Sequence, residues 1–443
     1  MTNIRLSDHF TYRKLLCFTL PSIAMMIFTS IYGVVDGFFV SNYVGKTPFA
    51  ALNFIMPFIM ILGTIGFMFG TGGSALISKT MGEGDMEKAQ RLFSLFVYVP
   101  AGLSVVIAAI GIFFLPQVTR LLGADESMLE DCVLYGRIVL SALPAYTLQM
   151  EFQTFFVTAE KPHLGFAVTV IAGVTNMVLD ALFVVVFHWG LAGAAAATAL
   201  SQVVGGVVPI IYFARPNRSL LRLTKTSYDG KALLRATTNG FSEFLSNVSI
   251  SLVAMLYNMQ LMKYAGQNGV AAYGTIMYID MIFSASFIGY SIGTAPVIGY
   301  HYGAQNHSEL KSLLRKSVVL IGIAGMLMCV FAEIMARPLA LIFSSYDQEL
   351  LEMTIHGFRI YAFSFLTVSI TIFGSAFFTA LNNGLISALI SFLRTAVFEV
   401  LCVLILPLYW ELDGIWFSII LARSLAAAMT VLFLAANQKR YHY

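Results

Sequence analysis

Long apolar runs follow one another along nearly the whole chain, separated by short polar connections. A helix rises 1.5 Å per residue, so about 20 mostly apolar residues cross the hydrocarbon core of a bilayer. Twelve runs reach that length, and we expect each to form a transmembrane helix. The predicted helices cover residues 15–41, 49–77, 91–115, 131–158, 163–187, 190–213, 236–262, 270–300, 315–342, 353–381, 384–408 and 411–437. The pattern predicts an all-α integral membrane protein.

The composition points the same way. Of 443 residues, 58% are hydrophobic and 11% are charged, whereas soluble domains carry about 25% charged residues. The mean hydropathy is +0.81. The first fourteen residues are polar and the first apolar run already has spanning length, so we expect no cleavable signal segment. The lipid bilayer is therefore the first partner that the sequence predicts.

Several function classes find no support in the sequence. A GxxxxGK[ST] nucleotide-binding loop is absent, so we expect no ATP-driven pump within this chain. The four cysteines share no metal or redox spacing, and the seven histidines show no pair four residues apart. We therefore expect no cofactor, no structural metal, no nucleic-acid partner and no enzymatic activity.

The distribution of lysine and arginine predicts the orientation of the helices. With the N-terminus in the cytoplasm, the inside segments hold eighteen of the 26 basic residues, and the outside segments with their flanks hold six. Cytoplasmic loops carry an excess of basic residues, so we expect both termini on the cytoplasmic side. The inside residues are Arg5, Arg13, Lys14, Lys79, Lys88, Arg91, Lys161, Arg215, Arg218, Arg222, Lys225, Lys231, Arg235, Lys311, Arg315, Lys316, Lys439 and Arg440.

The chain also repeats itself. SALISKTMGEGDMEK (74–88) aligns with APVIGYHYGAQNHSE (295–309) at an offset of 221, and GKTPFAAL (45–52) aligns with GQNGVAAY (266–273) at the same offset. An offset of half the chain predicts two pseudo-symmetric six-helix lobes, since six crossings return the chain to its starting side. Such lobes meet at a central cavity. The predicted parts are an N-terminal lobe (1–213), a cytoplasmic basic linker (214–235) and a C-terminal lobe (236–443).

Asp36 and Asp180, inside predicted helices of the first lobe, are candidates for a functional site. Asp36 is about 8 Å and Asp180 about 10 Å below the outer end of its helix. Thr198 lies about 12 Å down the next helix, and Asn176 precedes Asp180 by one turn. A carboxylate at membrane depth costs at least a few kcal/mol unless it faces a cavity, a partner or a proton. We predict that the four side chains hold a proton or a monovalent cation such as Na⁺; the alternative is separate helix–helix hydrogen bonds.

Pro21 lies inside the same predicted helix as Asp36. A proline frees a backbone carbonyl and marks a place where a helix can bend. The sequence thus indicates a titratable group on a bendable helix, as a pump requires. A structural aspartate bonded to a neighbouring helix is the simpler alternative.

The second lobe carries both acids and bases at membrane depth. Asp280 and Arg394 lie near mid-membrane, Glu399 lies about 14 Å below the outer end of its helix, and Arg423 lies about 18 Å down the next one. We expect Glu399 to face Arg423 across this hairpin. Two acids and two bases can neutralise each other, so the cluster is predicted to be structural or a rigid rim of the cavity. The first lobe has no intramembrane base, so we expect ion coupling there.

Further polar residues are candidates for contact with a substrate. Glu243, near the inner end of its helix, is either a second protonatable or substrate-contacting acid or a side chain that extends to the interface. Each of the others is, taken alone, more often a packing contact. They are Tyr32, Gln149, Gln153, Tyr257, Asn258 and Gln260.

Together these stretches resemble the multidrug and toxic compound extrusion (MATE) family. The resemblance covers nearly the whole chain. NGFSE, after the linker, is similar to the MepA-like bacterial branch. The matching stretches are Pro21 with VDGFFVSNYVG, SALISKTMGEGD, APVIGYHYGA, TNMVLDALF and GAAAATALSQ.

The resemblance implies efflux of cationic or aromatic compounds in exchange for inward H⁺ or Na⁺. It also implies a monomer in the bacterial cytoplasmic membrane and a proline that bends the first helix, here Pro21. The chain departs from branches with a glutamate deeper in the seventh helix, so the resemblance assigns no coupling role to Glu243. The residues that match the first-lobe cation site, with a tyrosine beside it, are Asp36, Asn176, Asp180, Thr198 and Tyr32.

Two other interpretations remain open. A lipid-linked precursor flippase of the same superfamily would share both lobes, but such flippases often line the cavity with basic residues, whereas the unpaired intramembrane charge here is acidic. A membrane-embedded enzyme or receptor would need a catalytic cluster or large external domains, and the sequence shows neither.

Overall fold

A computed structural model describes residues 4–122, 126–217, 219–344 and 347–443. Within those ranges the ordered elements are all helical. Arg218, part of the predicted linker, lies outside the described residues.

The first half of the chain forms seven α-helices. They are α1 (Tyr12–Phe39), α2 (Lys46–Gly82), α3 (Met86–Leu121), α4 (Glu126–Ser141), α5 (Leu143–Thr158), α6 (Pro162–Asp180) and α7 (Gly190–Ala214). The second half forms α8 (Gly230–Gly303), α9 (His307–Ser344), α10 (Gln348–Ala362), α11 (Phe365–Ala380), α12 (Gly384–Phe392), α13 (Glu399–Ile405) and α14 (Pro407–Tyr441). Three wider, π-helical segments are η1 (Val40–Val44), η2 (Ala181–Val186) and η3 (Leu393–Phe398).

These helices make the twelve predicted crossings. In the described part of the chain, nine helices are long and apolar enough to span a bilayer, and α10 with α11, bent by 52°, makes a tenth span. As a straight rod α8 would be about 110 Å long, but it reverses at Gly266 (φ +60°, ψ −150°) and therefore contributes two crossings. The pair α4–α5, which meets at Ala142, supplies the remaining one. The predicted fold class is confirmed.

Several helices extend beyond the predicted apolar runs. The start of α3 lies five residues before the predicted one, where the Asp85 side chain accepts a hydrogen bond from the Lys88 N–H. Asp229 caps α8 and Asp347 caps α10 in the same manner. Hydropathy marks the part of a helix inside hydrocarbon, whereas capping residues mark where the helix begins. The apolar runs are therefore shorter than the helices.

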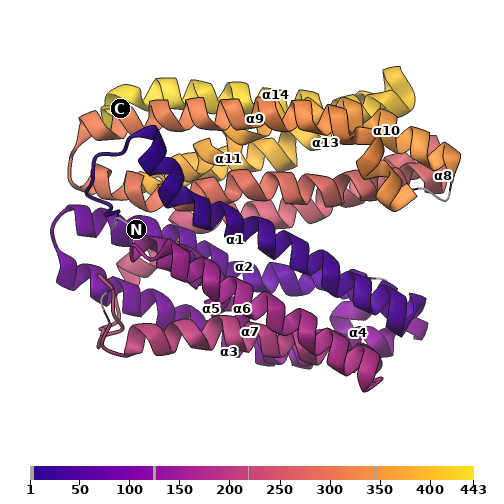
Figure 1. Ribbon diagram of the computed structural model, residues 1–443, viewed down its shortest axis with the longest axis horizontal. Coiled ribbons are helices and arrows are strands. Elements are labelled where there is room, and N and C mark those ends of the chain that lie inside the picture. Colours follow the sequence, from indigo (N-terminus) through magenta and orange to yellow (C-terminus); the bar gives the residue numbers. More distant parts are fainter. Residues whose placement is uncertain (1–3, 123–125, 218, 345–346) are drawn as a thin grey trace.

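The two lobes lie side by side in Figure 1, with α1 to α7 in indigo to magenta and α8 to α14 in pink to yellow. The helix α1 runs along the boundary between them, and both termini lie at the same end of the molecule, here called the terminal end.

Glycines bring the lobes into backbone contact at the terminal end. A Cβ on Gly82 would lie 2.0 Å from the Tyr300 carbonyl oxygen, and one on Gly303 would lie 2.0 Å from the Lys79 carbonyl oxygen. The two contacts are reciprocal, because Gly82 and Lys79 each stand 221 positions before Gly303 and Tyr300. This is the offset of the repeat, so the repeated loops meet across the pseudo-symmetry axis.

The segment before α1 is bonded to both lobes. In this N-terminal strap (residues 4–11), the Leu6 N–H donates to Glu160 Oε1 over 2.6 Å, and Glu160 lies between α5 and α6. Glu309, near the start of α9, bonds His9 Nδ1 over 2.6 Å and accepts from the Phe10 N–H over 2.9 Å. The strap thus ties the lobes together at the terminal end.

Replacing Glu309 with alanine should release the strap. The substitution removes the buried acceptor of the Phe10 N–H, and an unsatisfied buried donor costs about 1–3 kcal/mol. We expect a lower Tm in detergent and protease cleavage within the strap. Glu87→Ala is the control, because the Glu87 side chain is 83% exposed and pairs with Arg91 on its own helix. Equal stability and equal cleavage in the two variants would show that the strap contributes nothing.

Candidate functional site

The structure brings the four polar residues of the first lobe together. Asp36 comes from α1, Asn176 and Asp180 from α6, and Thr198 from α7. Thr198 Oγ1 donates to Asp36 Oδ1 over 3.4 Å, and the side chains of Asn176 and Asp180 also adjoin the Asp36 carboxyl group. Asp36 is 8% exposed and Asp180 is fully buried. Asp36, Asn176, Asp180 and Thr198 are called the acid site below.

Irregular helix geometry lies close to several of the intramembrane charged residues, although not to Asp280 or Arg423. The segment η2 begins directly after Asp180, and η1 begins four residues after Asp36. In the second lobe, η3 contains Arg394 and ends directly before Glu399. Wider π-helical turns occur mostly at functional sites, where they shift side chains from the regular helical register.

The acid site contains acceptors without donors. Both carboxylate oxygens of Asp180 and the Oδ1 atom of Asn176 are buried and have no hydrogen-bond partner. The two carboxyl groups act on each other, and in the described part of the chain no ion pair links either of them to a base. Buried acceptors left in this way require a proton or a cation. The oxygen ligands of the site, from two carboxyl groups, one amide and one hydroxyl, fit H⁺ or Na⁺.

Two tyrosines adjoin the acid site, and a third adjoins one of them. Tyr32, predicted from the sequence, adjoins Asp36, Tyr146 and Gln149. Tyr135 adjoins Asp36 and Thr198 and donates weakly to Met56 Sδ over 3.9 Å. Tyr135 and Tyr146 were not predicted, because a tyrosine inside an apolar helix gives no signal of the direction in which its hydroxyl points.

Glu151 is a further buried acid that the sequence interpretation overlooked. It lies on α5, is fully buried, and neither carboxylate oxygen has a hydrogen-bond partner. Its backbone packs against α2, where a Cβ on Gly70 would lie 3.1 Å from the Glu151 Cα. An acid inside a predicted span was the signal that identified Asp36, and it applied to Glu151 equally.

In the second lobe, the expected pairing of Glu399 with Arg423 is wrong. The Arg423 guanidinium forms its ion pair with Asp280 of α8, with Nη1 to Oδ1 at 3.2 Å. It also donates to Ser364 Oγ over 2.9 Å and to Tyr361 Oη over 2.6 Å. Helix packing brings α8 and α10 to α14 at this depth, and the planar guanidinium bonds all three groups at once. Glu399 interacts with Arg423 only at longer range.

The other candidates lie in different surroundings. Glu243, on α8, is half-buried with Arg394 as its charged neighbour, and Arg394 donates to Ser246 over 3.5 Å. Tyr257 is buried in the second-lobe core, bonded to Ser418 over 2.9 Å.

Of the last two candidates, Asn258 is exposed, whereas Gln260 is half-buried. With Tyr257 in the core, these neighbouring positions on α8 do not share one surface.

Twelve crossings in two lobes, with a buried acid site in one of them, define a polytopic membrane transporter fold. The chain belongs to the MatE family, whose family model matches residues 21–182 and again residues 244–405. The repeated match, with starts 244 − 21 = 223 positions apart, falls close to the offset of the loop repeat.

The relatives are multidrug export proteins of staphylococci. The chain is 23% identical over 431 residues to the multidrug export protein MepA of Staphylococcus haemolyticus (strain JCSC1435), covering 97% of this chain and 94% of that protein. It is 22% identical over 430 residues to MepA of Staphylococcus aureus (strain MSSA476), covering 96% and 94%.

The solved structures share the fold over the full length. A MATE structure in complex with MaL6 has a TM-score of 0.94 at 22% identity, covering 100% of this chain and 99% of that one. A MATE structure in the straight conformation gives a TM-score of 0.93 at 22% identity, with coverage of 100% and 99%. One in the bent conformation gives 0.90 at 22% identity, with full coverage of both chains.

The Asp280–Arg423 pair predicts a distinctive stability pattern. Arg423→Ala leaves a mostly buried carboxylate unpaired, which typically costs about 3–5 kcal/mol. The double variant Asp280→Asn/Arg423→Ala should recover part of this loss, measured as Tm in detergent, whereas adding Glu399→Gln to Arg423→Ala should recover less. If the Asp280 and Arg423 effects are simply additive, the pair does not stabilise the fold.

Proposed function

We propose that the protein exports cationic and aromatic small molecules in exchange for inward H⁺ or Na⁺. One observation supports this most directly: Asp36 and Asp180 are buried together without a base, and the Asp180 oxygens are unpartnered. Two adjacent carboxyl groups in a medium of low dielectric cannot both stay ionised without a compensating cation. The names of the staphylococcal relatives support drugs as substrates.

The helix α1 supplies the proposed mechanical link. Pro21 is buried in its first half and cannot donate a hydrogen bond to the Cys17 carbonyl. The turns beside Pro21 are clasped by α8, where a Cβ on Gly289 would lie 2.5 Å from the Ile23 Cα and one on Gly293 would lie 2.8 Å from Thr19. The half that carries Asp36 is therefore free to bend while the half before it stays fixed.

Exchange then follows from competition for one charge. An ion entering from outside neutralises the acid site, α1 bends at Pro21, and the first-lobe cavity closes, which releases the bound compound outward. The ion must leave before a cationic compound binds again. This reciprocal exclusion is the thermodynamic requirement of antiport.

The setting of this function is the bacterial cytoplasmic membrane, with the protein as a monomer. Both termini lie at one end of the molecule, and the excess of lysine and arginine in the segments at that end supports a cytoplasmic location for it. The outer depth of Asp36 and Asp180 then suits loading from the outside.

Removing either charge of the acid site should abolish efflux. We expect that Asp36→Asn and Asp180→Asn each reduce ethidium or norfloxacin efflux to the background of a pump-deficient strain, while the protein still inserts and expresses. Asp413→Asn is the matched control, because the Asp413 side chain is 51% exposed and pairs with the exposed His356. Full resistance in cells that express either acid-site variant at normal levels would exclude this site.

Ion dependence of binding tests the exchange itself. For the purified protein, the affinity for a cationic dye should fall as pH drops or Na⁺ rises, because ion and dye compete for the same carboxylates. Asp36→Asn should flatten that dependence, and the response to each ion identifies the coupling ion. Wild-type affinity that responds to neither ion would contradict antiport.

A further inference from the structure

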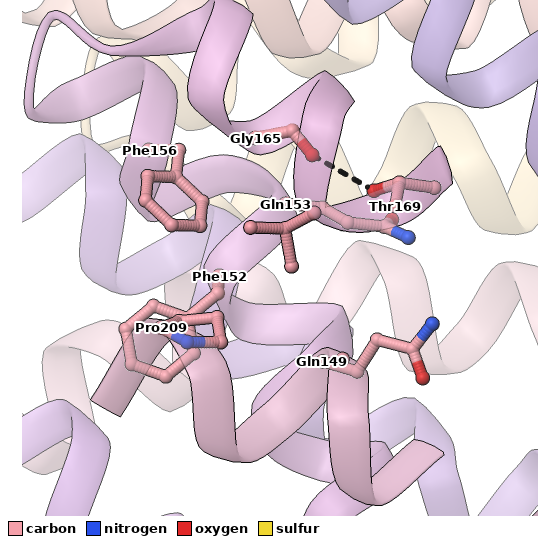
Figure 2. A pocket seen from close by; sticks show the side chains of 9 residues that line it. Gln149, Phe152, Gln153, Phe156, Gly165, Thr169 and Pro209 are labelled. Atoms are coloured by element: carbon pink, nitrogen blue, oxygen red, sulfur yellow. Dashed lines mark hydrogen bonds between the residues drawn. The ribbon is translucent and has the colours of Figure 1, made fainter. Parts of the chain in front are cut away.

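A small cavity lies inside the first lobe, among α5, α6 and α7 (Figure 2). Its empty volume is about 210 Å³, which includes space open to its surroundings, and it has room for about one water molecule. Its apolar walls include Phe152, Phe156 and Pro209, and its polar lining consists of Gln149, Gln153 and Thr169. We call it the α5–α7 cavity.

Two polar atoms of this cavity lack hydrogen-bond partners among the described residues. Gln149 Oε1 and Gln153 Nε2 are buried without a hydrogen-bond partner, and the two side chains are 5% and 3% exposed. Thr169 Oγ1 donates to the Gly165 carbonyl over 3.0 Å, which leaves its lone pairs free to accept. One orphan is an acceptor and the other a donor. A water molecule satisfies both, whereas a metal cation would satisfy only the oxygen.

The cavity is adjacent to the acid site on its terminal-end side. Gln149 adjoins Tyr32, which in turn adjoins Asp36. On α6, Thr169 precedes Asp180 by eleven residues, or about 16 Å, and both are buried on the face that includes Asn176. Polar groups therefore extend from Asp36 through Tyr32 and Gln149 towards Gln153 and Thr169.

An apolar closure separates the cavity from the loop between α5 and α6. A Cβ on Gly165 would lie 3.0 Å from the Phe156 Cβ, and the Phe156 ring packs against Phe213 with centroids 5.2 Å apart. This loop, which carries the strap acceptor Glu160, lies at the terminal end. Movement of Phe156 would open the cavity to that end.

We propose that the α5–α7 cavity holds a water molecule that conducts the coupling proton from the acid site to the terminal end, through the first lobe rather than through the central cavity. The inference rests on the proposed exchange function. The proton leaves a carboxylic acid oxygen of Asp36 or Asp180, passes to water and is released as hydronium, so the carboxylate regains its charge and no redox partner is needed. Gln149, Gln153 and Thr169 orient the water and carry no charge themselves. A route one water wide passes H⁺ and excludes Na⁺ with its hydration shell.

The experiment measures proton release into proteoliposomes that contain a pH indicator, while the protein transports a cationic dye. Gln153→Met and Thr169→Val should each slow proton release about tenfold, a barrier about 1.4 kcal/mol higher. The pH dependence of equilibrium dye affinity should stay as in the wild type, because the acid site is intact. Thr169→Ser, which keeps the hydroxyl, should retain the wild-type rate. Val174→Ala, on the exposed face of α6 and away from the cavity, is the control and should also leave the rate unchanged.

The outcomes separate this proposal from the proposed function. Wild-type proton release in Gln153→Met and Thr169→Val, with pH-dependent dye binding intact, overturns the route while exchange stands. If Thr169→Ser slows proton release as much as Thr169→Val does, the route is also overturned. The defect then comes from altered packing and not from loss of the hydroxyl. Wild-type protein whose affinity for the cationic dye depends on Na⁺ but not on pH, and which releases no proton, overturns the route alone. Affinity that depends on neither ion, again without proton release, overturns both.

Discussion

Two carboxyl groups buried together without a base are the constraint on which the first lobe depends. Asp36 and Asp180 lie against each other. The hydrogen bond from Thr198 to Asp36 is long, at 3.4 Å, and both Asp180 oxygens lack a partner among the residues that the structure describes. In the proposed function, a bound proton or cation balances their charge. The second lobe shows the contrasting solution, since Asp280 receives Arg423 in an ion pair. The second lobe thus pairs an intramembrane acid with a base of its own, whereas the acid site of the first lobe has no such partner among the described residues.

This asymmetry within a repeated fold explains where movement can arise. In the second lobe, Arg423 also bonds Ser364 and Tyr361, so α8, α10 and α14 are held in one arrangement. In the first lobe, the proposed exchange requires that the neutral and charged states of the acid site favour different distances between α1 and α6. The region around Pro21 is fixed by α8, so the difference is accommodated in the half of α1 that carries Asp36.

The sequence predicts the transmembrane spans, which depend on the surrounding solvent or lipid. It does not predict the side-chain contacts that depend on packing between distant helices. Twelve spans follow from hydropathy, because each must be apolar on its own, and the loop repeat predicted two six-helix lobes. The contacts of Gly82 and Gly303 across the lobes were not predicted and came from the structure. The partner of Arg423 did not follow, because depth along a helix does not determine which helix lies opposite. The assembly of the acid site was predicted from depth together with the family resemblance. Tyr135, whose contribution depends on side-chain direction, was missed.

Closure of the terminal end sets the remaining requirement for exchange. There the lobes are joined by reciprocal glycine contacts between α2 and α8 and by a strap bonded to one acid from each lobe. Access from that end requires these contacts to separate, although the acid site lies far from them along α1. In the proposed exchange, ion binding therefore has to change the stability of the terminal-end contacts. A rigid element that adopts two positions can transmit this change. The helix α1 meets this condition, because it follows the strap directly, is clasped by α8 around Pro21, and carries Asp36 beyond the bend.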